Sequence, residues 1–222
     1  MHHTQIHVID FEGTRSSGIV EYGVVTVVGA VIESTATRIC APEGSISDVD
    51  QRQHGISEAS AAEQQSFTNE WERFAALRQS GPLCAHNAAV EDGLLCSVWS
   101  FPRESPNFAN TDAPVATWGP WLDTLYLYRR IYPQIDSHKL EDLIRFFGLQ
   151  PELDRQAERY CPAGRQRFHC ALYDALASAL LLVRLYSEPE LNEISLPWML
   201  LQSAASATDR ANFEQQQLFE SL

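Results

Sequence analysis

The sequence has few positive charges, no long apolar run and no paired cysteine motif. Its 16 lysine and arginine residues stand against 29 aspartate and glutamate residues, which gives a net charge of −13 over 222 residues. A protein that wraps a long nucleic-acid duplex neutralises phosphates with lysine and arginine. We therefore do not expect this chain to bind a long duplex in that way.

The missing apolar run and the cysteine spacing exclude two further classes of protein. No segment is long and apolar enough to cross a membrane, and the polar residues 1–5 do not form a signal peptide, so we expect a cytoplasmic protein without membrane contact. The five cysteines are odd in number and lack a Cys-x-x-Cys pair, which argues against a disulfide framework or a zinc site. With 45% hydrophobic residues, the chain can build one sizeable core.

What the chain has is a set of acidic residues that lie far apart in the sequence. Asp10 and Glu12 follow an apolar run that predicts a buried strand, and alternate residues of a strand share one face. Glu91 and Asp92 fall in the first turn of a predicted helix, where the helix dipole also favours carboxylates. Each pair therefore has a structural explanation when it is taken alone.

His169 and Asp174 stand at the start of a segment rich in alanine and leucine, which predicts a helix. Five residues correspond to about 500° of helical rotation, so we place His169 at or before the helix start and Asp174 on its inward face. Carboxylates from all these segments would repel one another in one place unless divalent cations neutralised them. Two such cations can clamp the attacking and leaving oxygens of a phosphoryl displacement, so the pattern favours a metal-dependent nuclease.

These residues resemble the DEDD superfamily of 3′→5′ exonucleases, in the DEDDh subclass, whose third motif is a histidine followed five residues later by an aspartate. Ribonuclease T, oligoribonuclease and the proofreading subunit of bacterial DNA polymerase form this group. The resemblance extends over about residues 6–182 and combines six motifs in the family's order. They are Asp-x-Glu at 10–12, Glu-Tyr-Gly at 21–23, Gln-His-Gly-Ile at 53–56, Ala-His-Asn-Ala at 85–88, Leu-Asp-Thr at 122–124, and His169 with Asp174.

The resemblance implies an α/β fold of the ribonuclease-H-like type, with a mixed five-stranded sheet flanked by helices and a C-terminal helical extension. From periodicity alone we would claim only an α/β domain. We expect an exonuclease domain at residues 1–186 and the extension at 187–222. The extension is predicted to contain one or two helices at 196–222, which either pack back on the domain or form a partner-binding or dimerisation arm, so a homodimer stays open. We expect strands at 6–10, 19–32, 35–41, 83–85 and 121–122, helices at 61–78, 91–99, 124–131 and 138–147, and a loop at 101–120.

The resemblance also implies a metal-dependent hydrolysis of phosphodiester bonds at the 3′ ends of single-stranded DNA or RNA. Two Mg²⁺ or Mn²⁺ ions would be held by Asp10, Glu12 and Asp174, and Glu91 would complete the set directly or through water. His169 would be the general base that takes a proton from the attacking water, a role that suits a side chain titrating near neutral pH. The bound metals would supply positive charge that the chain itself lacks.

Further residues are expected near the terminal nucleotide, because their family counterparts flank it. The predicted substrate contacts are Gly13, Thr14, His54 and Asn87. His54 and His86 are equally well explained as hydrogen-bonded structural histidines, and Asn87 as a turn or cap residue. For Asp123, capping of the following helix is the better explanation. The basic residues that could contact the nucleic-acid backbone are Arg15, Arg129, Arg130, Lys139, Arg165 and Arg167.

Two departures from the family pattern keep alternatives open. Gly13 replaces a threonine of the first motif, which removes one hydroxyl near the scissile phosphate. The family spacing from His86 reaches Glu91 instead of an aspartate, so we favour Glu91 as the ligand and keep Asp92 as the alternative. The rival functions are a catalytically weakened exonuclease fold that serves as a binding module, and a phosphodiesterase for very short oligonucleotides.

Overall fold

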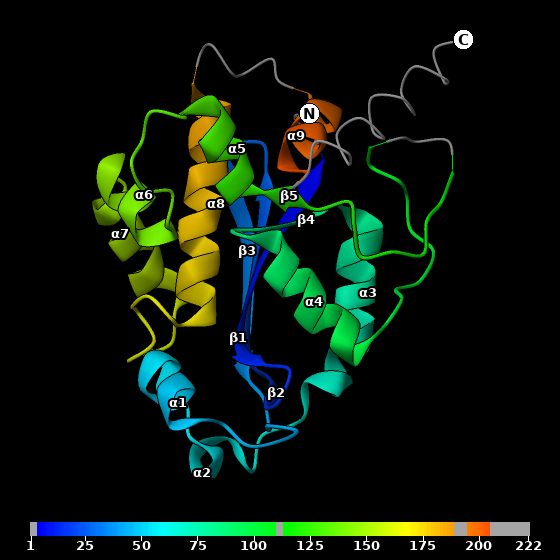
Figure 1. Ribbon diagram of the computed structural model, residues 1–222, viewed down its shortest axis with the longest axis vertical. Helices are drawn as coiled ribbons and strands as arrows, with labels where there is room; N and C mark the ends of the chain where they lie inside the picture. The colour runs from blue at the N-terminus through cyan, green and yellow to red at the C-terminus, as the bar shows by residue number, and fades with distance from the viewer. Residues whose placement is uncertain (1–3, 110–112, 189–194, 205–222) are drawn as a thin grey trace.

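The computed structural model describes residues 4–109, 113–188 and 195–204, and their centre is one mixed sheet with the strand order β3-β2-β1-β4-β5 (Figure 1). β1 (Gln5–Thr14), β2 (Gly18–Val28) and β3 (Val31–Ile39) form an antiparallel meander. β4 (Leu83–Ala85) pairs in parallel with β1, and β5 (Leu122–Asp123) pairs in parallel with β4. The predicted mixed five-stranded sheet is therefore confirmed.

The strand boundaries differ from the prediction in the meander. The predicted strand at 19–32 is wrong, because a turn at Gly29 separates β2 from β3. Gly29 has a φ of 59°, a left-handed conformation that glycine adopts without steric cost. The valine-rich run on both sides of this glycine hid the turn. β1 is also longer than predicted and continues through the acidic motif to Thr14.

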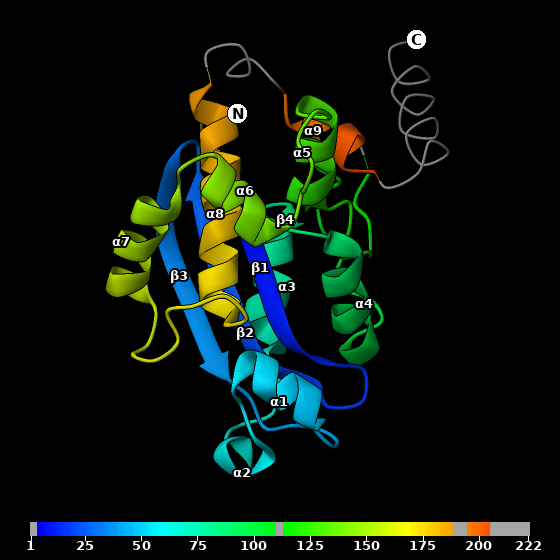
Figure 2. The ribbon, with the colours of Figure 1, turned by 60° about the vertical axis from the view of Figure 1, so that its left-hand side comes forward.

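Helices cover both faces of the sheet (Figures 1 and 2). One face carries α8 (Ala171–Ser187), which packs along β1 and β2, with α5 (Thr124–Ile131), α6 (Leu140–Phe146), α7 (Gln150–Tyr160) and α9 (Leu196–Ser203) around it. The other face carries the 3₁₀ helix η1 (Phe67–Glu70), α3 (Trp71–Ser80) and α4 (Ala88–Val98). The short helices α1 (Asp48–His54) and α2 (Glu58–Ala61) lie beyond the end of the sheet where β1 finishes.

Alternation along β1 divides the buried side chains between two cores. Ile6 and Val8 belong to the core under α8, whereas Ile9 and Phe11 belong to the core under α3 and α4. Asp10 continues the first series, and Glu12 follows it, because every second residue of a strand points to the same face. Asp10 and Glu12 therefore lie on the α8 side of β1, near its C-terminal end.

Several predicted helices begin or end elsewhere. The single helix predicted at 61–78 is wrong, because the chain forms α2, a turn, η1 and α3 there, with the Ser66 hydroxyl accepting a hydrogen bond from the Thr68 amide. α4 begins at Ala88 and α6 at Leu140, and not at 91 and 138. The sequence did not predict α1 or α7. α7 is mainly polar and buries only Leu153 and Ala157, which leaves little apolar periodicity to detect.

The loop between α4 and β5 is anchored by one buried cation. Arg78 of α3 is fully buried, and its guanidinium donates to the carbonyl oxygens of Thr117 (3.1 Å), Pro106 (3.0 Å) and Gly119 (2.7 Å). Its charge also lies 5.3 Å from the centre of the Phe108 ring. The predicted loop at 101–120 is thus a fixed part of the fold wherever it is described.

The C-terminal extension is described only as far as residue 204. α9 packs against α5 and β5, which agrees with the predicted packing of a helix back onto the domain. The second half of the predicted helical region, residues 205–222, lies outside the described residues, and the division at 186/187 stays a prediction. Among the described residues, no helix combines the length and apolar character needed to span a membrane.

Candidate active site

Asp10 and Glu12 lie where β1 extends beyond its parallel neighbour. β4 pairs with β1 only through His7 and Val8, so the last part of β1 has an open edge. Glu12 is buried and Asp10 is half-buried. A β-bulge between Glu12 and Gly13 shifts the register of the pairing with β2, which continues to Thr14. The two carboxylates therefore stand at a strand end that the sheet itself does not cover.

Glu91 closes this open edge from α4. Its Oε2 accepts a hydrogen bond of 3.0 Å from the backbone amide of Phe11, an amide that β4 is too short to pair. This contact places Glu91 beside Asp10 and Glu12. Asp92 points elsewhere, because its Oδ1 accepts a hydrogen bond of 2.8 Å from Nε1 of Trp121. The structure thus brings Glu91, and not Asp92, to the carboxylates of β1.

Asp174 reaches the same place from the first turn of α8. Its Oδ2 accepts a hydrogen bond of 2.9 Å from the backbone amide of His169, which has a left-handed φ of 63° and lies just before the helix. As predicted, His169 precedes the helix and Asp174 lies inside it with a buried side chain. Glu12, His169 and Asp174 each offer one potential ligand atom within 4.8 Å of the other two.

Burial first, and then the charges of nearby carboxylates, raise the pKa of four carboxyl groups, which we call the acidic cluster: Asp10, Glu12, Glu91 and Asp174. The pKa of Asp10 lies well above its usual range, through burial first and then through the charges of its acidic neighbours. Burial raises the pKa of Glu12 and of Glu91 to about 8, and that of Asp174 to about 7. Without a counter-charge, the acidic cluster therefore retains protons near neutral pH.

The acidic cluster has the properties of a divalent cation site. Oδ1 of Asp174 is buried and has no hydrogen-bond partner among the described residues. An orphaned buried carboxylate oxygen is costly, and a metal ion would satisfy it. Carboxylate oxygens are the ligands that Mg²⁺ and Mn²⁺ prefer. The donor set therefore fits such an ion.

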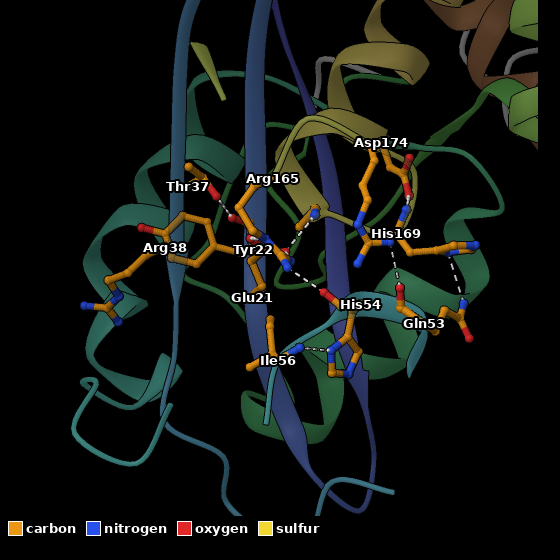
Figure 3. A network of polar contacts seen from close by, with 12 residues as sticks. Glu21, Tyr22, Thr37, Arg38, Gln53, His54, Ile56, Arg165, His169 and Asp174 are labelled. Carbon is orange, nitrogen blue, oxygen red and sulfur yellow. Dashed lines mark hydrogen bonds and ion pairs between the residues drawn. The ribbon is translucent and has the colours of Figure 1, made fainter. Parts of the chain in front are cut away.

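A polar network joins the acidic cluster to the C-terminal end of α1 (Figure 3). Arg165 forms a bidentate ion pair with Glu21 of β2 and donates to the carbonyl of His54, while Glu21 also accepts the amide of Ala171 at the start of α8. Gln53 reaches Nδ1 of His169 at 3.1 Å. These contacts fix α1 and the start of α8 to the same strand, so the surroundings of His169 are built from three separate segments.

The profile of the RNase T family, described as Exonuclease, matches residues 7–182. The chain belongs to this exonuclease family. The predicted DEDDh family membership is thereby confirmed, and nuclease activity on nucleic acids follows from it.

Solved exonuclease structures share the fold at low sequence identity. The structure titled "Exonuclease X in complex with 5′ overhanging duplex DNA" has a TM-score of 0.63 at 23% identity, over 90% of this chain and 99% of that chain. The nuclease domain of 3′hExo, a DEDDh family member bound to rAMP, has a TM-score of 0.55 at 17% identity, over 85% and 94%. E. coli Exonuclease I with a dT13 oligonucleotide gives 0.59 at 16%, over 86% and 43%. No curated protein sequence matches the chain.

The two motif histidines of this exonuclease have different surroundings. His86 is engaged at both ring nitrogens, by the hydroxyl of Thr124 and the carbonyl of His138, each at 2.9 Å. This arrangement matches the structural interpretation of His86. His54 is buried and its Nδ1 accepts the Ile56 amide at 3.1 Å, but its Nε2 has no partner within the described part of the chain. Burial lowers the pKa of both rings, to about 4 for His86, so each is neutral at pH 7.

Gly13 and Thr14, which are also predicted substrate contacts, have structural roles. Gly13 adopts a φ of 128°, and a Cβ there would lie 2.2 Å from the carbonyl oxygen of Gly18, so the bulge requires glycine. The hydroxyl of Thr14 accepts hydrogen bonds of 3.2 Å from the amides of Ser16 and Ser17. This turn leaves the roles of Gly13 and Thr14 toward a substrate as predictions.

Asn87 and Asp123 connect the two parallel strands to their helices. Asn87 has a left-handed φ of 74°, and its amide donates to Oδ1 of Asp123 at 3.1 Å. Asp123 also accepts the amides of Ala88, Leu125 and Tyr126. The capping interpretation of Asp123 is confirmed. For Asn87 the structure shows a turn conformation without a side-chain cap.

Sequence reasoning missed the partners that position these residues. Arg165 and Arg167 were identified only as basic residues, and the pairing of Arg165 with Glu21 joins positions 144 residues apart. Gln53 was noted as part of a motif but not as a partner of His169. The available signal was their place in the sequence, because Arg165 and Arg167 shortly precede His169 and Gln53 belongs to the motif at 53–56.

Proposed function

We propose that this exonuclease removes nucleotides from the 3′ ends of single-stranded DNA or RNA in a reaction that depends on two Mg²⁺ or Mn²⁺ ions. The observation that carries the proposal is the acidic cluster, in which carboxylates from β1, α4 and α8 meet around a buried oxygen without a partner. Carboxylates placed so closely are unfavourable in a fold unless they bind cations. Their arrangement therefore serves a metal-dependent reaction.

Each residue of the acidic cluster has a proposed role. Asp10, Glu12 and Asp174 would hold the ions, and Glu91 would complete the set while its other oxygen stays on the Phe11 amide. The bound ions would activate a water molecule and stabilise the charge on the scissile phosphate. His169 is exposed and lies beside Glu12 and Asp174, which suits a general base that takes the proton of the attacking water.

Two features support a strand end as the substrate. The net charge of −13 disfavours an extended contact with a duplex, whereas a strand end presents few phosphates. Gln53, in the last turn of α1, contacts His169 at the edge of the acidic cluster, so the Gln-His-Gly-Ile motif at 53–56 begins beside the site. This position agrees with the proposal that this motif flanks the terminal nucleotide. Solved relatives are complexes with DNA or with rAMP, which supports nucleic acid as the ligand class.

Hydrolysis of labelled oligonucleotides tests the proposal against its rivals. Single strands of several lengths, labelled at the 5′ or the 3′ end, are incubated with Mg²⁺, Mn²⁺ or excess EDTA. We expect mononucleotides released from the 3′ end, only with metal, and no cut in a circular single strand. Binding without hydrolysis would favour the binding module, and hydrolysis confined to the shortest strands would favour the short-oligonucleotide phosphodiesterase. Nuclease activity in excess EDTA would refute the metal-dependent mechanism.

A further inference from the structure

Two arginines lie beside the acidic cluster, and the structure assigns them different situations. Arg165 is largely buried, and its guanidinium is used by Glu21 and by the carbonyl of His54. Arg167 is exposed and forms no ion pair with any carboxylate in the described ranges. Arg165 is therefore committed to the fold, whereas the charge of Arg167 is not neutralised by a partner.

The guanidinium of Arg167 is held in place by neutral groups. Its Nη1 donates to the carbonyl oxygens of Gln53 (3.1 Å) and Phe168 (3.3 Å), which joins the last turn of α1 to the segment before α8. Its Nη2 lies 3.0 Å from the position that a Cβ on Gly55 would occupy. A flexible side chain is thus fixed between the two segments that border His169.

Arg167 also acts on the acidic cluster from this position. Its positive charge lowers the pKa of Glu12 and of Asp174, against the larger effect of burial. The guanidinium therefore lies close enough to those carboxylates to be felt electrostatically, but not in ion-pair contact with them. An anion that approaches the acidic cluster would meet the same charge.

We propose that Arg167 binds a phosphate group of one of the last phosphodiester linkages of the strand. The contact would use the guanidinium N–H groups that do not donate to the carbonyl oxygens of Gln53 and Phe168. This inference rests on the proposed function and names a substrate contact within it. A guanidinium matches the geometry of phosphate oxygens and keeps its charge at every relevant pH. In a chain with a net charge of −13, such a fixed cation is a distinctive feature of the site.

Binding measurements test this contact without relying on turnover. The Kd of a short 5′-labelled oligothymidylate is measured in EDTA and in Ca²⁺ for the wild type, Arg167→Gln, Arg167→Lys and Arg159→Gln. Arg159 is the matched control, because it is also exposed and lies on α7. We expect Arg167→Gln to weaken binding about tenfold and to lower the slope of log Kd against log salt by about 1, with partial recovery in Arg167→Lys. Equal weakening by Arg159→Gln would show a general charge effect and overturn the proposal.

A neutral linkage identifies the phosphate. Oligothymidylates with a single methylphosphonate are prepared with that linkage at each of the terminal positions in turn. At one position we expect the substitution to weaken wild-type binding and to leave Arg167→Gln binding unchanged, because both changes remove the same contact. An effect of Arg167→Gln that is the same for every linkage would reject the proposal. Failure of the proposed function would be seen separately, as wild-type protein that binds oligonucleotide but does not hydrolyse it with Mg²⁺ or Mn²⁺.

Discussion

Arg78 and the acidic cluster are both charged groups removed from water, but their surroundings differ in kind. The Arg78 guanidinium donates to three carbonyl oxygens and thereby fixes the loop before β5. The carboxylates of the acidic cluster face one another, and one buried oxygen of Asp174 has no partner in the described part of the structure. A buried charge that is fully hydrogen-bonded supports the fold, whereas a buried charge without a partner destabilises it. The acidic cluster is therefore explained by ligand binding and not by a contribution to stability.

The largest expected effect comes from neutralising one member of the acidic cluster. Asp174→Asn should abolish detectable turnover, because the site then lacks a metal ligand, while the fold is retained or becomes more stable as repulsion is relieved. Hydrolysis with Mn²⁺ and chemical unfolding in EDTA are measured on the same preparations. A variant that keeps its activity, or that loses stability as strongly as an Arg78 variant, would contradict the comparison.

The exposed histidine at the edge of the acidic cluster is expected to affect rate without affecting stability. His169→Ala should lower kcat by about 10²–10⁴-fold, the usual contribution of a positioned general base. Its unfolding free energy should stay close to that of the wild type, since the ring is exposed and its backbone amide still reaches Asp174. Single-turnover hydrolysis and urea unfolding give the two numbers. An unchanged rate would remove His169 from the mechanism.

Adjacent residues on α4 allow the same contrast within one helical turn. Glu91→Gln should remove most activity and weaken metal binding, because Glu91 lies in the acidic cluster. Asp92→Ala should retain activity and lose about 0.5 to 1.5 kcal/mol of stability, because it removes the acceptor of the hydrogen bond from Trp121. Hydrolysis rates and Mn²⁺ titration by calorimetry separate the two variants. If Asp92→Ala were the inactive one, the assignment of Glu91 would be wrong.

Removing the buried cation should reverse the pattern seen for the acidic cluster. Arg78→Met leaves three carbonyl oxygens without their donor and should lower the unfolding free energy by about 3 to 5 kcal/mol. Arg73→Met is the control, because Arg73 lies on the same helix, is half-exposed and pairs with Glu70, so its loss should cost about 1 kcal/mol or less. Urea unfolding of both variants checks this. Similar losses would show that the burial of Arg78 is unimportant.

The smallest expected effect is a pH dependence of the stability of the metal-free protein. The pKa of Glu12 and Glu91 is about 8 in the fold, above the ordinary 4.5, so the folded state binds more protons than the unfolded chain between these values. The unfolding free energy should therefore fall as pH rises through this window. Buried neutral histidines such as His7 and His86 act in the opposite sense below about pH 6.5, so the decisive range is pH 6.5 to 8.

Unfolding in EDTA across that pH range, for the wild type and Asp174→Asn, isolates the contribution of the acidic cluster. We expect a decrease on the order of 2 kcal/mol for the wild type, a smaller decrease for the variant, and a flat profile after Mg²⁺ is added. A wild-type stability that increases from pH 6.5 to 8 in EDTA would contradict the raised pKa values.

The sequence predicts those parts of the molecule that depend on local pattern. Alternation along β1 placed Asp10 and Glu12 on one face, and the spacing from His86 favoured Glu91 over Asp92. The single helix at 61–78 was wrong because a turn interrupts the aromatic periodicity, while Phe67 and Phe74 still pack together with ring centres 5.0 Å apart. A common buried face was detected, but the break in the backbone was not.

The remaining features depend on contacts between distant segments. The pair formed by Arg165 and Glu21 joins the segment before His169 to β2, and no local sequence pattern predicts such a partner. The hydrogen bond from Phe11 to Glu91 exists only because β4 ends after three residues, which is a property of the sheet as a whole. These contacts determine the surroundings of the site, whereas the candidate ligands themselves follow from the local sequence pattern.

Gly23 sets how closely the two halves of the acidic cluster approach each other. It lies opposite Asp10 across β1 and β2, and a Cβ there would fall 2.3 Å from the backbone carbonyl of Ala171 at the start of α8. α8 therefore rests directly on the strand backbone at this point. A methyl group at position 23 would lift the start of α8 and widen the gap between Asp10 and Asp174. The absence of a side chain at position 23 therefore allows the carboxylates of β1 and α8 to lie close together.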